Sequence, residues 1–236
     1  MISIIIPAHN EIDNLERLLP MLEGMNSPMS IEVLVALSCE NNDGSENIQR
    51  TPSVEIIKCV RKGRASQMNA AVKKSTGKIL VFLHADVTPP HTFFQDINTT
   101  LLGAYDAGYF SYKFDKDNYF LKFNASFTVK DGIFTGGGDQ CLFIKRTVFL
   151  KLGGFDEQQV LMEDFEFFDR MKKNEIRYKI IKNDLIVSAR KYKSNSYARV
   201  NLSNLVLLVL YKFGYPSIKL KALHDKLLHT PYQTST

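Results

Sequence analysis

Short runs of β-branched and other apolar residues alternate with helical periodicity through the first half of the chain. An apolar run bounded by turn residues predicts a buried strand, and apolar residues spaced three and four apart predict a helix. The expected strands cover residues 2–6, 31–37, 54–60 and 79–83, and the expected helices cover residues 12–22 and 64–75. Strands and helices that alternate in this way predict an α/β fold with a mostly parallel sheet.

The pattern is less regular in the second half of the chain. Residues 108–114 alternate as in an antiparallel strand. Further strands are expected at 141–145, 176–181 and 185–189, and helices at 146–152 and 163–173. Two more helices, separated by Gly214, Tyr215 and Pro216, are expected within residues 200–228.

The length of 236 residues and the hydrophobic content of 44% suit one compact domain. We expect a catalytic domain over residues 1–198 and a helical appendage over residues 199–236 that packs on it. The chain starts directly with strand residues and no basic leader, and its apolar run at 205–210 is far shorter than a membrane span. We therefore expect a soluble or peripheral protein.

Cysteine content and charge narrow the classes of partner. The 3 cysteines are widely spaced and follow no zinc pattern, which suits a reducing cytoplasm. The net charge of +5 is mildly basic and favours an anionic ligand in a cleft. Because the basic residues are scattered and accompany no nucleic-acid motif, we expect no nucleic-acid binding.

The most informative segment is the apolar run at 79–83, which ends in His84, Ala85 and Asp86. A parallel strand that delivers an aspartate to its carboxyl end can hold a cation against a phosphorylated ligand. Mg²⁺ and Mn²⁺ prefer oxygen ligands, so Asp86 is the expected metal ligand. His84 is expected either to join it or to donate a hydrogen bond to a phosphate.

A basic segment and an acidic segment add candidate chemistry. Arg64 follows Gly63 at the expected start of a helix, where backbone donors, helix dipole and guanidinium all favour negative charge. Glu163 and Asp164 stand in the first turn of another helix. Acidic residues there are also what the helix dipole favours, so a purely structural role is the alternative.

Six segments occur in an order that resembles glycosyltransferase family 2. They are Pro-Ala-His-Asn-Glu at 7–11, Ser-Cys-Glu-Asn-Asn-Asp-Gly-Ser at 38–45, Gly-Arg-Ala-Ser-Gln-Met-Asn at 63–69, His-Ala-Asp at 84–86, Gly-Gly-Gly-Asp-Gln at 136–140 and Leu-Met-Glu-Asp at 161–164. The resemblance covers residues 2–192 and is closest to a bacterial subgroup with His-Ala-Asp in place of the family's Asp-x-Asp metal motif.

The resemblance implies a GT-A fold, which is a Rossmann-like three-layer α/β/α sandwich, here with C-terminal helices. It implies transfer of a sugar from a nucleoside diphosphate sugar, of the UDP or GDP type, to an acceptor hydroxyl with inversion. Mn²⁺ or Mg²⁺ is the implied cofactor, with Asp86 and His84 as its ligands.

The resemblance also implies a role for each site residue. Asp164 is the expected base and Glu163 its supporting neighbour, while Asp139 and Gln140 are expected near the acceptor and the transferred sugar. The expected donor-binding residues are Pro7, Ala8, Glu11, Ser38, Arg64, Asn69, His84, Ala85 and Arg190. Ser38 departs from the family, which usually has an aspartate there to contact the base, so the sequence leaves the base unassigned.

Two other functions stay open at this point. One is nucleotidyl transfer to a sugar phosphate, and the other is a non-catalytic module that binds a sugar nucleotide or docks on a membrane. An apolar stripe in the tail is expected to pack on the catalytic domain, or else on the inner face of a membrane or a second subunit of a homodimer. The sequence leaves the hydroxyl acceptor unassigned, with a lipid and a glycan as the two candidates. The stripe consists of Leu202, Leu205, Val206, Val209 and Leu210.

Overall fold

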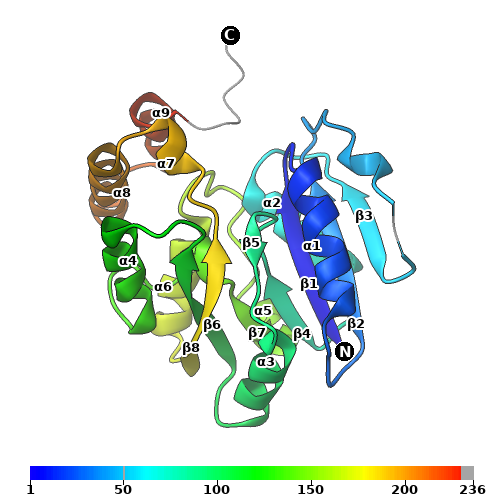
Figure 1. The fold of residues 1–236 in the computed structure, drawn as a ribbon. Helices are drawn as coiled ribbons and strands as arrows, with labels where there is room; N and C mark the ends of the chain where they lie inside the picture. The colour runs from blue at the N-terminus through cyan, green and yellow to red at the C-terminus, as the bar shows by residue number, and fades with distance from the viewer. Residues whose placement is uncertain (50, 230–236) are drawn as a thin grey trace.

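The computed structural model describes residues 1–49 and 51–229, which form one mixed sheet with helices on both faces (Figure 1). The strands follow the order β3-β2-β1-β4-β7-β6-β8-β5 across the sheet. Their bounds are β1 Ile2–Ala8, β2 Ile31–Leu37, β3 Val54–Lys58, β4 Ile79–Phe82, β5 Val87–Thr88, β6 Ala107–Phe114, β7 Phe143–Lys145 and β8 Tyr178–Val187. The expected α/β fold with a mostly parallel sheet is confirmed.

Helices connect most of these strands. They are α1 Ile12–Gly24, α2 Arg64–Lys74, α3 Phe93–Leu102, α4 Tyr119–Ser126, α5 Arg146–Lys151, α6 Glu163–Lys173, α7 Lys191–Ser194, α8 Tyr197–Lys212 and α9 Ser217–Leu227. Short 3₁₀ turns occupy Ser45–Asn47, Phe127–Val129 and Gly138–Gln140.

The first half of the sheet is parallel, as the alternation of strands and helices predicts. β1 pairs in parallel with both β2 and β4, so that Ile4 lies between Val33 and Val81. Strands buried on both faces read as continuous apolar runs, and this explains the run of isoleucines in β1. Because parallel strands end at one edge of the sheet, residues that follow β1, β2 and β4 are brought to the same side.

The second half of the sheet differs from the sequence expectation in the pairing of β6, in the extent of β8 and in the short strand β5, which was not expected. β6 is antiparallel to β7 but parallel to β8, so the expected antiparallel strand has one neighbour of each kind. The two strands expected at 176–181 and 185–189 are one strand, β8, with a register shift opposite Phe110 and Tyr112. A bulge keeps a strand continuous while interrupting its alternation, which is why the pattern divides it.

Two apolar layers fix the helices on the sheet. On one face, α1 and α3 contribute to one apolar layer through residues such as Leu18 and Phe94, together with Ile4 of β1, and α3 lies over β6 and β7. On the other face, α2, α5 and α6 pack through residues such as Met68 and Phe167. Alternate side chains of β1 enter the two layers, since successive side chains of a strand point to opposite faces.

Of the two C-terminal helices, α8 lies beside α4 and α6, and α9 packs on α8. Asn201 of α8 accepts a hydrogen bond from Asn124 of α4, and Lys212 pairs with Asp169 of α6 at 2.8 Å. No helix among residues 1–49 and 51–229 is both long and apolar enough to cross a bilayer. The predicted division at residue 198 stays a prediction, and residues 230–236 of the predicted appendage lie outside the described residues.

Candidate active site

One cavity of about 650 Å³ gathers charged residues from distant parts of the chain. It opens beyond the ends of β4, β6 and β8, whose last residues or following turns line it. The sequence-predicted residues that line the cavity are Arg64, His84, Asp86, Asp139, Gln140, Asp164 and Arg190. Asp86 and Asp164 therefore share one cavity, as a single active site requires.

Asp164 is held at the start of α6 by two backbone donors. Its Oδ2 accepts a hydrogen bond from the N–H of Gly138 at 2.5 Å, and its Oδ1 accepts one from the N–H of Phe165 at 2.9 Å. Burial, reinforced by the negative charge of Glu163, raises the pKa of Asp164 to about 6. A carboxylate with such a pKa is ionised at neutral pH and is a stronger base than an exposed aspartate.

Glu163 is buried beside Arg64. The Nη1 of Arg64, at the start of α2, lies 3.3 Å from Oε1 of Glu163, whose side chain is only 5% exposed. This pairing compensates a carboxylate that would otherwise be costly to bury. The guanidinium of Arg64 also lines the cavity, so it joins the first turns of α2 and α6 at the site.

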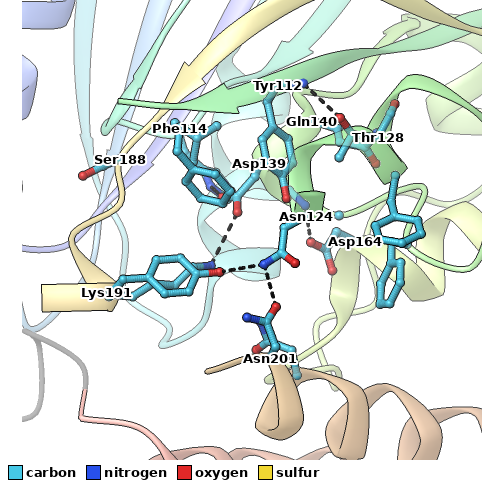
Figure 2. Close-up of a pocket in the computed structure, with 18 of the residues that line it drawn as sticks. Tyr112, Phe114, Asn124, Thr128, Asp139, Gln140, Asp164, Ser188, Lys191 and Asn201 are labelled. Carbon is cyan, nitrogen blue, oxygen red and sulfur yellow. Dashed lines mark hydrogen bonds and ion pairs between the residues drawn. The ribbon is translucent and has the colours of Figure 1, made fainter. Parts of the chain in front are cut away.

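Asp139 is surrounded by positive charge. Its Oδ1 lies 3.4 Å from Nδ1 of His84, and its Oδ2 lies 3.7 Å from Nζ of Lys191. Burial favours the neutral acid, but the charge of Lys191 and the hydrogen bond from His84 outweigh it and hold the pKa of Asp139 well below its usual range. Figure 2 shows Asp139 and Lys191 facing each other in the cavity.

Arg190 links the cavity to the end of β1. Its two Nη atoms donate to both carboxylate oxygens of Glu11 at 2.6 and 2.9 Å, while its Nε lies 3.2 Å from Oδ2 of Asp86. Glu11 is nearly buried and also accepts a hydrogen bond from Asn14. Arg190, which follows β8, thus connects the segment after β1 with the segment after β4.

The remaining residues expected near the nucleotide base lie at the ends of β1 and β2. The carbonyl of Ala8 accepts hydrogen bonds from the N–H of Ser38 at 2.9 Å and from the side chain of Gln67 at 2.9 Å. Pro7, Ala8, Glu11 and Ser38 do not line the 650 Å³ cavity, and Ala85 is packed in the core. Their predicted contacts with a donor stay predictions.

Two other predicted site residues make structural contacts. Asn69 exchanges hydrogen bonds with the backbone of Phe155 and also donates to Glu157. Gln140 is buried, accepts a hydrogen bond from the N–H of Gly136 and donates to the carbonyl of Thr128. These contacts hold the loops that follow α5 and precede β7, so contact of either residue with a sugar or donor stays a prediction.

The side chains of the cavity can hold a divalent cation only when oxygen atoms of a bound ligand complete its coordination. His84 and Asp86 both line the cavity, and residues 85 and 86 form a turn after β4. Among residues 1–49 and 51–229, no group of three or more His, Cys, Asp or Glu side chains is arranged to hold a metal. Mg²⁺ is commonly bound by one or two carboxylates plus substrate phosphates, and Asp86 fits that mode.

The opposite wall of the cavity consists of residues that sequence reasoning missed. Asn124 of α4 donates to Asn201 of α8 at 2.6 Å (Figure 2). It also accepts a hydrogen bond from the hydroxyl of Tyr197 at 2.7 Å. The aromatic and apolar members of this wall are Phe123, Phe127, Phe134, Phe165, Leu205 and Leu208. One signal in the sequence could have indicated this wall: Asn201 and Asn204 interrupt the otherwise mostly apolar helix α8.

Solved structures with the same fold cover nearly the whole chain. The mannosyltransferase PcManGT from Pyrobaculum calidifontis, solved with GDP-Man and Mn²⁺, matches with a TM-score of 0.65 and 18% identity over 96% of this chain and 70% of its own. TarS residues 1–349 from S. aureus, solved with UDP-GlcNAc, matches with a TM-score of 0.64 and 14% identity over 96% of this chain and 71% of its own. These likenesses confirm the GT-A fold expected from the sequence.

Sequence comparison gives the family. Glycosyltransferase AglE of Haloferax volcanii is 26% identical over 109 residues, which cover 44% of this chain but only 36% of AglE. Residues 3–148, well over half of the chain, match glycosyl transferase family 2. They include β1, β2, β4 and the turn that carries Asp86. The chain therefore belongs to glycosyl transferase family 2.

Proposed function

We propose that this protein transfers a sugar from a nucleoside diphosphate sugar to an acceptor hydroxyl with inversion at the anomeric carbon. The observation that carries the proposal is the shared cavity, which is lined by the basic residues Arg64, Arg190 and Lys191, by Asp86, and by the raised-pKa carboxylate of Asp164. The basic residues and Asp86 suit a diphosphate, and the carboxylate of Asp164 suits a hydroxyl nucleophile.

Asp164 is the proposed general base. The acceptor oxygen attacks the anomeric carbon, the bond from that carbon to the diphosphate oxygen breaks, and the hydroxyl proton passes to Asp164. A single displacement of this kind inverts the anomeric centre. The N–H of Gly138 fixes the carboxylate for this step.

Arg190 and Lys191 are proposed to bind the diphosphate that leaves during transfer. Arg190 presents a guanidinium beside Asp86, and Lys191 presents an ammonium beside Asp139. Charged donors of this kind stabilise the negative charge that develops on a leaving group. Asp86, with His84, would hold Mn²⁺ or Mg²⁺, which when bound supplies further charge compensation for the diphosphate.

The donor is proposed to be a UDP or GDP sugar. The solved relatives with the same fold include one bound to GDP-Man with Mn²⁺ and one bound to UDP-GlcNAc. Ser38, at the end of β2, offers a hydroxyl where the family usually has a carboxylate. A neutral hydroxyl accepts and donates hydrogen bonds, so it is compatible with either base.

Thermal unfolding with a panel of nucleotides tests the donor part of the proposal. UDP, GDP, TDP and CDP are added with Mn²⁺, with Mg²⁺ or with EDTA, and Tm is measured. A ligand that binds the folded state raises Tm by mass action, so one nucleotide should raise Tm selectively and more so with the metal. If none of the four changes Tm under any of these conditions, the donor assignment is wrong.

Donor turnover tests the reaction itself. Release of the nucleoside diphosphate is followed with UDP and GDP sugars, because cleavage of the bond from the anomeric carbon to the diphosphate frees it. Release of pyrophosphate from a nucleoside triphosphate and a sugar phosphate would instead establish nucleotidyl transfer and overturn the proposal.

A further inference from the structure

An exposed apolar surface surrounds one side of the cavity mouth. We call it the apolar rim, and it consists of Phe120, Phe123 and Phe127 from α4 and the 3₁₀ turn, and Leu202, Leu205, Val206, Val209 and Phe213 from α8 and its end. All of these side chains are at least 37% exposed. Exposed apolar patches of this extent on a soluble domain usually mark an interaction surface.

The apolar rim is continuous with the lining of the cavity. Phe123, Phe127 and Leu205 both line the cavity and belong to the rim. Phe123 contacts Phe127 with ring centroids 5.0 Å apart, and Phe127 contacts Phe134 at 5.9 Å. These aromatic rings therefore form a path from the surface into the cavity.

The two helices of the rim expose their apolar sides together. Residues 202, 206, 209 and 213 follow each other at intervals of three or four, so they share one side of α8. The side of α8 that carries Asn201 and Leu208 faces the cavity instead. Figure 1 shows α4 and α8 next to each other at one edge of the molecule, and the contact of Phe120 with Tyr197 joins them.

Exposed basic residues accompany the rim. Between residues 191 and 229 the only acidic residue is Asp225, which pairs with Lys221. The exposed basic residues of this region are Lys193, Arg199, Lys212, Lys219, Lys221 and Lys226, of which Lys212 pairs with Asp169 of α6. Apolar side chains flanked by lysine are the combination that binds the surface of an anionic bilayer, where aromatic rings enter the headgroup layer and lysine meets lipid phosphate.

We infer that the apolar rim docks this protein on an anionic lipid bilayer, so that the active-site cavity opens at the lipid surface. Two features favour a bilayer over a second copy of this chain as the occupant: the excess of positive charge around the rim and the continuity of the rim with a cavity that must stay open to ligands. Docking of the apolar rim on a bilayer does not depend on a bound sugar donor, so it can be tested without one.

Cosedimentation with lipid vesicles tests this inference. Wild-type protein is mixed with vesicles of phosphatidylglycerol and phosphatidylcholine, or of phosphatidylcholine alone. The rim variant is Leu202→Ser/Phe213→Ser, which removes side chains that are 65% and 86% exposed. The matched control is Leu102→Ser/Leu150→Ser, whose side chains are 79% and 57% exposed on α3 and α5.

Wild type and control should bind the anionic vesicles, more strongly at low salt, while the rim variant should partition at least roughly tenfold more weakly. Equal Tm values for the three proteins establish that the variants fold. If wild type stays in the supernatant, or the rim variant binds as wild type does, the inference is wrong. A wild-type dimer that the rim variant dissociates in analytical ultracentrifugation would assign the rim to a subunit contact and also overturn it.

The outcomes separate this inference from the proposed function. Vesicle binding without any nucleotide-dependent change in Tm would support the docking surface and reject the donor assignment. A nucleotide-dependent change in Tm without vesicle binding would support the donor assignment and reject the docking surface.

Discussion

The N–H of Gly138 donates a hydrogen bond to Oδ2 of Asp164, and this contact joins the 3₁₀ turn before β7 to the first turn of α6. The two residues are 26 positions apart in the chain. The contact leaves no room for a side chain at residue 138, because a Cβ there would lie 2.6 Å from the ring of His84 and 3.1 Å from Oδ2 of Asp164. Glycine at this position is what lets the backbone approach the carboxylate.

Gly138→Ala should therefore impair transfer while the protein still folds. The added methyl group must displace His84 or Asp164, and small displacements of a catalytic group cost about a hundredfold in rate. The matched control is Gly132→Ala, where a Cβ would meet nothing within 4 Å. Donor turnover of both variants is the measurement, and equal rates would show that the contact has no role in the reaction.

Asp164→Asn should abolish transfer and leave nucleotide binding close to that of wild type. The amide oxygen can still accept the hydrogen bond from Gly138, but the side chain can no longer take a proton, a loss of roughly 10²–10⁴-fold in rate. Asp169→Asn makes the same substitution on the same helix, at a residue paired with Lys212 outside the cavity. Single-turnover kinetics and nucleotide titrations of both variants check this; normal turnover by Asp164→Asn would remove it as the base.

The rate of transfer should depend on pH through Asp164. Because its pKa is raised to about 6, the base is ionised above that pH and protonated below it. We expect kcat/KM to be level above pH 7 and to fall about tenfold per pH unit well below pH 6. A pH–rate profile with constant ionic strength is the measurement. An inflection near pH 4 would mean that another, unperturbed carboxylate is the base.

The same residue should lower the stability of the fold at neutral pH. A carboxyl group whose pKa is higher in the folded than in the unfolded state costs stability when ionised, and this cost appears as the pH rises through the interval from about 4 to 6. Asp164→Asn should therefore raise Tm at pH 8, by roughly 2–4 °C for each kcal/mol gained. The gain should be smaller at pH 4. Calorimetry at both pH values decides this, and a gain that grows toward low pH would contradict it.

Asp86→Ala should weaken nucleotide binding in the presence of the metal. Loss of the carboxylate removes the expected metal ligand, so affinity should fall by roughly tenfold or more with Mn²⁺ and change little with EDTA. The control is Asp117→Ala, an exposed aspartate that pairs with Lys122 and does not line the cavity. Calorimetric titration measures both, and equal affinities for Asp86→Ala and wild type with Mn²⁺ would exclude metal binding there.

The parallel half of the fold could be predicted from the sequence because its strands are buried on both faces. The apolar runs at β1, β2 and β4 are therefore unbroken and easy to recognise. The sequence analysis did not predict α3, although Phe93, Ile97 and Leu101 follow each other at helical intervals. α4 could not be recognised by periodicity, since most of its aromatic residues are exposed.

Prediction of the site depended on where each residue stands in the chain. Arg64, Asp86 and Asp164 stand at the start of a helix or just after a strand, and the topology brings such positions to one edge of the sheet. The ion-pair partner of each charged residue depends on side-chain packing, which the pattern of apolar and polar residues in the sequence does not show. The pairings of Arg64 with Glu163 and of Lys191 with Asp139 could therefore be found only in three dimensions.

The bridge formed by Arg190 has a consequence for how the site accepts a ligand. Its guanidinium already contacts Glu11 and Asp86, so most of its charge is neutralised within the protein. An incoming anion must compete with these two carboxylates for the same donors. An anion that binds Arg190 therefore replaces a carboxylate as its partner. The free energy of binding at this position is the difference between the new ion pair and the one that is lost, instead of the full strength of the new pair.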